Sequence, residues 1–190
     1  LPKTAWASDL LIAEHFAGMP VVVCANLPYY ITSPIIMRLL EGPLPIRSLT
    51  VMVQKEAAVR ITAAPGTREC GAISAAVWYY STPKLLFPVS RGSFLPAPAV
   101  DSAVIRLDLP RELPEDLPPR EDFFAVVRAG FGQRRKTMLN SLSAGLRWEK
   151  DATRALLTAA GIAENTRAEQ VTLEQWKALT RAYFSMKKSR

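Results

Sequence analysis

The sequence predicts an α/β fold followed by a small all-α domain. Two short apolar runs, at residues 21–25 and 48–53, flank a helical stretch, and this order indicates a parallel sheet. A proline-rich segment at residues 109–119 has little to bury and is typical of a domain boundary. Beyond that segment the apolar residues recur with helical spacing. We therefore expect three parts: a sheet domain at 1–110, a linker at 111–119 and a helical domain at 120–190.

The first elements follow from local patterns. The segment Asp9–Phe16 is amphipathic and predicts a short helix. The run Val21–Ala25 is rich in β-branched residues and uninterrupted, which predicts a strand buried on both faces. Ser33 suits a helix N-cap and Pro34 suits the first turn, so we expect a helix that runs to Leu40.

The middle of the chain continues the alternation of strands and helices. Ser48–Val53 predicts a second buried strand, and Gln54–Ala63 predicts a helix. Gly71–Tyr80 fits either a helix or a strand, and we favour a strand at its Val77–Tyr80 end because β-branched and aromatic residues gather there.

Two further strands, at Leu85–Val89 and Ser102–Leu107, flank a loop. The loop is not helical, because Pro96 and Pro98 hold its backbone extended. Phe94 in this loop is either displayed at the rim of the sheet or buried as a hydrophobe that plugs the loop. From the residue pattern alone the second role is the expected one.

The last seventy residues predict a helical bundle. A first helix carries one apolar stripe, formed by Phe123, Phe124, Val127 and Phe131. Asp151 is expected to cap a second helix that ends at Gly161, and Thr172 with Gln175 forms a capping box. The last helix has its own apolar face, formed by Leu173, Trp176, Leu179 and Tyr183.

Composition excludes several classes of protein. The chain has 190 residues, of which 49% are hydrophobic, and no apolar run is long enough to span a membrane. The N-terminal residues lack the pattern of a signal peptide, so a cytoplasmic location is expected. Cys24 and Cys70 predict reduced thiols, and His15 is the only histidine, so neither a metal site nor a catalytic triad is expected.

Charge is distributed unevenly along the chain. The net charge is +7. Residues 1–119 carry 10 basic and 10 acidic side chains, whereas residues 120–190 carry 14 and 7. A basic surplus on one domain indicates nucleic-acid binding, although a solvated helical face with no partner is the alternative.

The turn Asn26-Leu27-Pro28-Tyr29 follows the first predicted strand, where ligands bind in open α/β sheets. The Asn26 carboxamide oxygen and the Leu27 carbonyl are two acceptors that Pro28 holds in place. Together they can hold one exocyclic amine, such as adenine N6, and accepting both of its hydrogens frees the nitrogen lone pair for attack. Tyr29 offers a flat face for a flipped base. An ordinary strand-to-helix turn with a capping Asn is the alternative.

The segment Gly130–Thr137 superficially resembles a phosphate-binding P-loop. That motif requires a glycine directly before the lysine and a preceding strand, whereas here Arg135 precedes Lys136 and a helix precedes the segment. We therefore reject the P-loop. Arg134, Arg135 and Lys136 at the start of the next helix suit contacts to RNA phosphates, with a solvated helix start as the alternative.

Taken together, these motifs resemble those of one family. Five of them occur in order: Asn26-Leu27-Pro28-Tyr29, Gln54-Lys55-Glu56, Phe94-x-Pro-x-Pro-x-Val-Asp-Ser, Gln133-Arg134-Arg135-Lys136-Thr137 and Arg167-Ala168-Glu169. They resemble the small-subunit ribosomal RNA adenine dimethyltransferases of the bacterial KsgA/RsmA type over essentially the whole chain.

The resemblance implies a Rossmann-like class I methyltransferase sheet and S-adenosyl-L-methionine as cofactor. It implies dimethylation of N6 on two adjacent adenosines in the 3′-terminal hairpin of 16S rRNA, by a monomer acting on the small ribosomal subunit precursor. It also implies that Asn26 and the Leu27 carbonyl hold N6 near the cofactor methyl group, so that Asn26 is also a cofactor contact. Tyr29 and Phe94 would then sandwich the base, which reverses the expectation for Phe94 given above.

The sequence departs from this family in one respect. The family's sheet begins with three strands that bring a glycine-rich cofactor loop, and no such loop occurs here before the Asn26 turn. We therefore expect a partial sequence that is inactive by itself. Two other functions stay open: a large-subunit rRNA adenine methyltransferase of the antibiotic-resistance type, and a non-catalytic ribosome-assembly factor.

Overall fold

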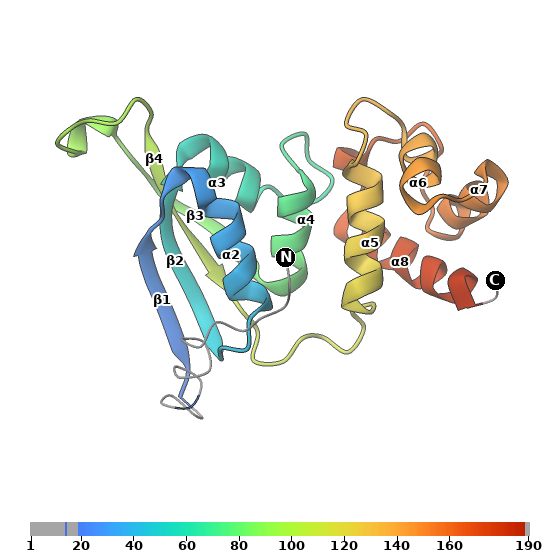
Figure 1. Ribbon diagram of the computed structural model, residues 1–190, viewed down its shortest axis with the longest axis horizontal. Coiled ribbons are helices and arrows are strands. Elements are labelled where there is room, and N and C mark those ends of the chain that lie inside the picture. The colour runs from blue at the N-terminus through green and yellow to red at the C-terminus, as the bar shows by residue number, and fades with distance from the viewer. Residues whose placement is uncertain (1–13, 15–18, 189–190) are drawn as a thin grey trace. The chain divides into compact units, whose positions relative to one another are not determined.

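The computed structural model describes Glu14 and residues 19–188 (Figure 1). The chain divides into two compact units. The first unit contains residues up to 62 together with 79–112, and the second contains residues 63–78 together with 113–190. The predicted helix Asp9–Phe16 falls almost wholly outside the described residues.

The first unit is built on a four-stranded sheet with strand order β1-β2-β4-β3 (Figure 1). Its strands are β1 (Val21–Asn26), β2 (Ile46–Gln54), β3 (Thr82–Val89) and β4 (Ser102–Asp108). β1 and β2 are parallel, as the sequence predicted, whereas β4 is antiparallel to both β2 and β3. The mixed sheet with helices agrees with the predicted α/β class.

The strand register places the ends of all four strands relative to one another. Asn26 at the end of β1 pairs with Met52, and Gln54 at the end of β2 pairs with Ser102 at the start of β4. Ser102 also pairs with Val89 at the end of β3. The chain segments that leave β1, β2 and β3, and the segment that enters β4, therefore share one edge of the sheet.

Two helices of this unit, α2 (Thr32–Glu41) and α3 (Lys55–Thr62), pack against the sheet (Figure 1). Their apolar faces bury Ile36, Leu40 and Ile61 over a sheet interior that includes Leu49 and Ile105. Burying such side chains is the main stabilising contribution to a unit of this size.

β1 differs from the strand that the sequence predicted. Its residues alternate between half-buried and exposed, and Val22 is 65% exposed. Val22, Cys24 and Asn26 lie on one face because side chains alternate along a strand. The expectation that both faces are buried is wrong for the described residues, because α2 packs against β2 while β1 lies at the edge of the sheet.

The start of α2 also differs from its prediction. The helix begins at Thr32, and Ile31 occupies the N-cap position without a side-chain hydrogen bond. Ser33 therefore lies inside the helix and is not its cap, whereas Pro34 lies in the first turn as expected. The Thr32 hydroxyl donates to the Pro28 carbonyl at 3.1 Å and thereby joins the helix to the preceding turn.

Residues 72–80 form a helix, α4 (Ala72–Tyr80), so the strand favoured at Val77–Tyr80 is wrong. The helix is apolar nearly all round, and Ala75, Val77 and Tyr80 are all buried. Periodicity does not separate a helix from a strand when every face is apolar, and the preference of aromatic residues for strands was misleading here.

The second unit is a helical bundle. It contains α5 (Arg120–Phe131), α6 (Met138–Leu146), α7 (Lys150–Ala159), the short η3 (Ala168–Gln170) and α8 (Leu173–Lys188). The side chains of Phe123, Met138, Leu142, Leu156 and Trp176 are fully buried between these helices. No helix in the described part of the chain is long and apolar enough to cross a membrane.

The helix ends of this bundle are partly as predicted. The Thr172 amide donates to the Gln175 side chain at 3.1 Å and the Gln175 amide donates to the Thr172 hydroxyl at 3.3 Å, which confirms the capping box. Gly161 follows α7 with a φ of +63°, a conformation that favours glycine. Asp151 lies within the first turn of α7, and Glu149 occupies the N-cap position, so the predicted Asp151 cap is wrong.

Residues 63–78 group with the helices, whereas the division predicted at residue 110 placed them with the sheet. One reason is visible within the second unit. Gly66 has a φ of +95°, and a Cβ built on it would lie 3.3 Å from the Thr172 side chain. The backbone of this loop therefore approaches the segment before α8 closely.

Candidate functional site

The turn after β1 is held to β2 by the main chain. The Leu27 amide donates to the Met52 carbonyl at 3.1 Å, and the Leu27 side chain is buried. Asn26, one residue earlier, is exposed. The strand therefore ends with an anchored leucine beside an asparagine whose carboxamide faces solvent.

Pro28 sets the direction of the chain after the turn. Its carbonyl accepts hydrogen bonds from the Ile31 amide at 3.2 Å and from the Thr32 hydroxyl at 3.1 Å. These bonds form the short helix η1 (Tyr29–Ile31) and join it to α2. Within the described residues, neither the Asn26 carboxamide nor the Leu27 carbonyl has a hydrogen-bond partner. The turn thus presents two free acceptors on a fixed backbone.

Tyr29 is fixed by a residue far along the chain. Its hydroxyl lies 2.6 Å from the Ser102 hydroxyl, and Ser102 is fully buried at the start of β4. The Tyr29 ring itself is half-buried. A hydrogen bond of this length at one end of the ring restricts its rotation while part of its face stays accessible.

The β3–β4 loop is stabilised by hydrogen bonds at its base. The Asp101 carboxylate accepts from the Arg91 amide at 3.0 Å, and the Asp101 carbonyl accepts from the Lys55 amide at 3.0 Å. The Ser90 hydroxyl accepts from the Gly92 amide at 3.2 Å in the short helix η2 (Arg91–Ser93). These bonds fix the loop against the start of α3 as well as against itself.

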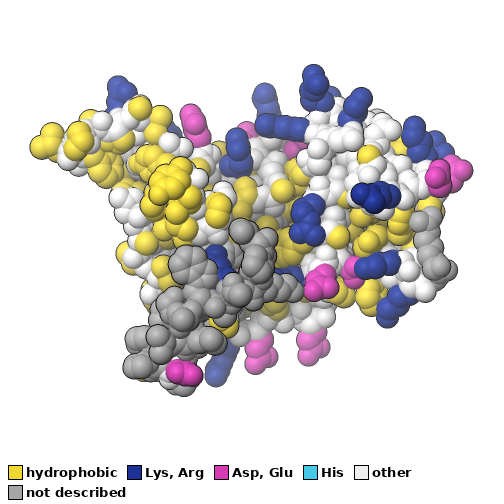
Figure 2. All heavy atoms as spheres, in the orientation of Figure 1, with side chains coloured by type: hydrophobic (Ala, Val, Ile, Leu, Met, Phe, Trp, Pro, Cys, Tyr) yellow, Lys and Arg dark blue, Asp and Glu magenta, His cyan; other side chains and the backbone are white. Residues whose placement is uncertain are grey.

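Phe94 follows η2 directly and is half-buried. Beyond it in the loop, Leu95 is fully exposed and Val100 is more than a third exposed, and Phe87 in the preceding strand β3 is also more than a third exposed. Figure 2 shows hydrophobic side chains gathered over this projecting loop. Phe94 therefore lies at the base of an apolar, solvent-exposed segment.

The sheet register brings the predicted site residues to one edge. Asn26, Leu27, Pro28 and Tyr29 leave β1 there, and Phe94 lies in the loop that joins β3 to β4 at the same edge. In the described part of the chain the rings of Tyr29 and Phe94 make no contact with each other.

Two residues of this edge were not given a role from the sequence. Ser102 fixes the Tyr29 ring, and Asp101 closes the β3–β4 loop. Both belong to the Phe94-x-Pro-x-Pro-x-Val-Asp-Ser motif. A serine and an aspartate directly before an apolar strand are a signal for loop closure, because their oxygens accept hydrogen bonds from a nearby turn.

The predicted RNA-binding residues lie in the second unit. Arg134, Arg135 and Lys136 occupy the turn between α5 and α6, so the expectation of a helix start is wrong: α6 begins only at Met138. All three side chains are exposed, and none forms an ion pair with a described residue. We call these three residues the cationic turn.

Several other cations of the second unit, unlike these three, have carboxylate partners. Arg154 pairs with Asp151 and Glu164, and Arg181 pairs with Asp116. A hydrogen bond to Asp122 raises the pKa of Lys187 above its usual range. The cationic turn therefore places three consecutive positive charges at the surface with no carboxylate partner among the described residues.

The described residues contain no group of three His, Cys, Asp or Glu side chains able to hold a metal ion. Both cysteines are free, with Cys24 exposed and Cys70 buried.

Comparison with known sequences gives consistent matches. The sequence model of the family described as "Ribosomal RNA adenine dimethylase" matches residues 7–184. "Ribosomal RNA small subunit methyltransferase A" of Alkaliphilus oremlandii (strain OhILAs) is 52% identical over 171 residues, which are 89% of this chain and 59% of the relative. The protein of the same name from Clostridioides difficile (strain 630) is 44% identical over 170 residues, or 90% and 59% of the two chains. The chain thus spans about three fifths of the length of these curated relatives.

Solved structures show the same fold. A dimethyladenosine transferase from Plasmodium falciparum superposes with a TM-score of 0.69 at 23% identity, over 86% of this chain and 66% of that one. The 23S rRNA methyltransferase ErmE superposes with a TM-score of 0.63 at 28% identity, over 86% and 65% of the two chains.

Proposed function

The chain belongs to the ribosomal RNA adenine dimethylase family, and from this premise we propose the function of its sheet edge. We propose that, within a polypeptide of its relatives' length, this chain holds the target adenine and binds the RNA in an S-adenosyl-L-methionine-dependent dimethylation of adenine N6. The observation that carries the proposal is the pair of free acceptors, Asn26 and the Leu27 carbonyl, beside the fixed ring of Tyr29.

The two acceptors suit an exocyclic amine. Adenine N6 has two hydrogens, and its lone pair is delocalised into the ring. When the Asn26 oxygen and the Leu27 carbonyl accept both hydrogens, the nitrogen becomes more pyramidal and its lone pair becomes available. Because the backbone that carries both acceptors is fixed before the reaction, they stabilise the developing positive charge on N6 with little reorganisation.

Aromatic side chains at this edge suit a base that has left its stack. Tyr29 offers a ring whose orientation Ser102 restricts, and Phe94 projects from the clamped β3–β4 loop. Stacking a base on an aromatic ring contributes about 1–3 kcal/mol, enough to offset much of the cost of flipping. We propose that the two rings enclose the adenine from opposite faces.

The methyl donor supplies an electrophilic methyl group when it is bound. Of the residues of this chain, Asn26 fits a contact to that donor, because its exposed carboxamide lies at the carboxyl end of β1, where ligands bind in such sheets. No titrating side chain is required, since N6 releases its proton only after the new bond has formed.

The proposed substrate is the 3′-terminal hairpin of 16S rRNA, with two adjacent adenosines as targets. The names of the relatives at 44–52% identity favour the small subunit over a large-subunit enzyme of the ErmE type. We propose that the cationic turn contacts phosphates of this RNA, since its charges have no partner within the described chain.

We further propose a division of labour between a catalytic part at 1–110 and an RNA-binding part at 120–190, joined by the linker at 111–119. The enzyme would act as a cytoplasmic monomer on the small ribosomal subunit precursor, without a metal ion.

The proposal is tested with Asn26→Ala in a polypeptide of the relatives' full length that carries this chain. Losing one of two preorganised acceptors is expected to reduce single-turnover methylation by roughly 10²–10³-fold. RNA affinity should stay nearly unchanged, because Tyr29 still stacks on the base. The product, N6,N6-dimethyladenosine, is measured by mass spectrometry of the digested hairpin.

Asn165→Ala is the matched control, because Asn165 is also an exposed asparagine but lies in the second unit. It should methylate at the wild-type rate. A rate for Asn26→Ala within threefold of wild type would contradict the proposal. A wild-type polypeptide that binds the hairpin but never methylates it would indicate a non-catalytic assembly factor instead.

A further inference from the structure

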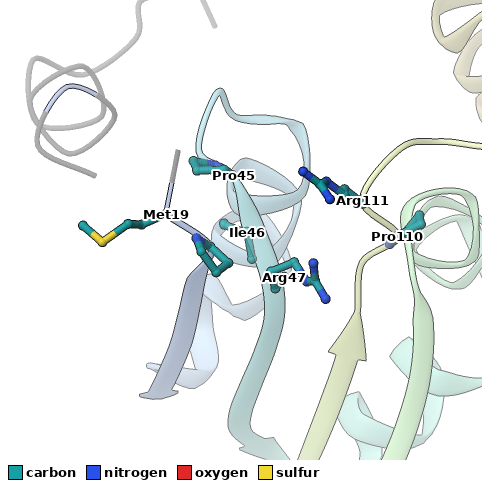
Figure 3. Close-up of a pocket in the computed structure, with 7 residues that line it drawn as sticks. Met19, Pro45, Ile46, Arg47, Pro110 and Arg111 are labelled. Atoms are coloured by element: carbon teal, nitrogen blue, oxygen red, sulfur yellow. The ribbon is translucent and has the colours of Figure 1, made fainter. Parts of the chain in front are cut away.

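A hollow of about 480 Å³ lies in the first unit, at the edge of the sheet opposite to Asn26. It is lined by Met19, Pro20, Pro45, Ile46, Arg47, Pro110 and Arg111 (Figure 3). These residues precede β1, lead into and begin β2, and follow β4. The hollow therefore takes no part in the adenine site proposed above.

Two arginines face this hollow from neighbouring segments. The Leu109 amide donates to the Arg47 carbonyl at 2.9 Å, so the segment that follows β4 runs beside Arg47, and Arg111 lies two residues further along that segment. Both arginines line the hollow, so they approach it from two segments that lie side by side. In Figure 3 Arg47 extends from β2 toward the segment after β4, and Arg111 extends from that segment toward β2.

Neither guanidinium has an anionic partner among the described residues. Asp108, two residues before Pro110, already pairs with Arg106 at 2.7 Å and with Lys84 at 3.6 Å. Glu112, next to Arg111, forms no ion pair with either arginine. Arginine stays charged at every physiological pH, so two like charges face one hollow without a counter-charge from the described part of the chain. Such a pair is repulsive unless an anion lies between its members.

The walls of the hollow strengthen the attraction for an anion. Pro20, Pro45 and Pro110 have no amide hydrogen and offer apolar rings, and Ile46, which also lines the hollow, is buried. An apolar wall lowers the local dielectric constant, which strengthens charge–charge attraction. The fork of a guanidinium also matches the oxygens of a phosphate in a bidentate contact.

We propose that Arg47 and Arg111 form a phosphate-binding site, separate from both the adenine site and the cationic turn. We propose that this phosphate belongs to the RNA backbone. Only the identity of the ligand, and not the existence of the site, rests on the proposed function. A contact there would hold the RNA on the sheet unit independently of the helical unit.

The test is a salt titration of RNA affinity with this chain, for wild type and for Arg47→Ala/Arg111→Ala. One phosphate held by the pair contributes a slope of about −0.7 to −0.9 in log affinity against log salt, so the variant should flatten the slope by that amount. The same flattening is expected with the 3′-terminal 16S hairpin and with an unrelated hairpin, because phosphate contacts do not read bases. Circular dichroism checks that the exposed substitutions preserve the fold.

Lys84→Ala/Arg106→Ala is the matched control. It removes two positive charges from the adjacent strands, but both already pair with Asp108. Its salt slope should equal that of wild type. If the control flattens the slope as much as Arg47→Ala/Arg111→Ala does, the effect belongs to general surface charge and the proposal is wrong.

A second measurement separates RNA from free phosphate as the source. Inorganic phosphate is titrated into the isotopically labelled chain, and the arginine side-chain NMR signals are followed. Saturable shifts at Arg47 and Arg111 together with the flattened RNA slope support the RNA source. Shifts without a change in RNA slope support the site with a free phosphate ligand. If the titration produces no shifts at Arg47 and Arg111 and the double variant leaves the RNA slope unchanged, the proposal is wrong, whatever the methylation assay of Asn26→Ala shows.

Discussion

The Ser102 hydroxyl is the clearest example of a single side chain that organises the candidate site, because it joins β4 to the Tyr29 ring at 2.6 Å. Ser102→Ala removes this hydrogen bond and should lower the free energy of unfolding by about 0.5–1.5 kcal/mol. Tyr29→Phe removes the same hydrogen bond by deleting the Tyr29 hydroxyl. The double variant should therefore cost less than the sum of the two single variants, as urea denaturation of this chain can measure.

Additive effects would show that the two hydroxyls do not depend on each other. Ser33→Ala is a suitable control, because Ser33 is exposed on α2 and makes no hydrogen bond to Tyr29.

We predict that the two cysteine thiols react at different rates with a thiol reagent. Burial raises the pKa of the Cys70 thiol, an effect that hydrogen bonds to Ser74 and to the Gly66 backbone partly offset, whereas Cys24 is exposed. At pH 8 a thiol reagent should modify Cys24 faster than Cys70, because Cys24 is exposed whereas burial both covers the Cys70 thiol and lowers its thiolate fraction. Mass spectrometry of the labelled peptides measures both rates, and equal rates in the folded protein would refute this prediction.

The sign of the pH effect on stability follows from the same shift. The raised pKa keeps Cys70 neutral in the folded state while the unfolded thiol ionises near its ordinary value of about 8.5. The contribution of Cys70 is fully present below that pH and is lost as the pH rises through the folded pKa.

At the scale of elements, close packing between helices makes Gly130 in α5 sensitive to substitution. A Cβ built on Gly130 would lie 2.5 Å from the Trp176 ring. Gly130→Ala gains at most about 1 kcal/mol in helix propensity, but overpacking costs about 1–3 kcal/mol. We expect a net loss of stability, measured as a lower thermal midpoint of this chain.

Gly92→Ala provides the comparison, because the nearest atom to its Cβ would be the Ser90 hydroxyl oxygen at an ordinary 3.7 Å. It should leave the midpoint nearly unchanged. A Gly130→Ala variant as stable as wild type would mean that Trp176 moves aside easily.

The elements that were predicted correctly are those whose residue pattern fits only one type of secondary structure. β2 and β4 are bounded by breakers and rich in β-branched residues, and both were found with small shifts of their ends. α4 was missed because its faces are nearly uniformly apolar. The caps at Ser33 and Asp151 were misplaced because a capping side chain is defined by backbone geometry that the residue type alone does not fix.

At the scale of the whole molecule, the basic surplus of residues 120–190 bears on RNA binding through the cationic turn. If Arg134, Arg135 and Lys136 each neutralise one phosphate, changing all three to Ala should flatten the salt dependence of RNA affinity by roughly two to three units. A salt titration of this chain measures the slope, and circular dichroism checks the fold.

Three other cations of the second unit supply a control with the same change of charge. Arg154, Lys177 and Arg181 already pair with carboxylates, so replacing these three with Ala should change the slope little. An unchanged slope for the cationic-turn variant would place the RNA surface elsewhere, first around Arg147 and Lys150.

The candidate site was predictable to the extent that its chemistry lies in consecutive residues. The free acceptors of Asn26 and Leu27 could be inferred from the turn itself. The hydrogen bond that restrains Tyr29 could not be inferred in this way, because its partner lies 73 positions later in the chain. Local residue patterns do not determine the order of strands in a sheet. The same is true of the hollow between Arg47 and Arg111, whose two sides meet only through the pairing of β2 with the segment after β4.

The strand order β1-β2-β4-β3 has a consequence for synthesis of the protein. The last strand to be made is inserted between two earlier ones, so β3 has no neighbour in this sheet until β4 has left the ribosome. The partner of Tyr29 arrives with the same strand. A nascent chain that ends before Ser102 therefore carries the complete Asn26–Tyr29 turn without the support for its aromatic ring. The platform proposed for the adenine is therefore completed only when β4 has been made and the sheet closes around it, before the helices α5 to α8 are synthesised.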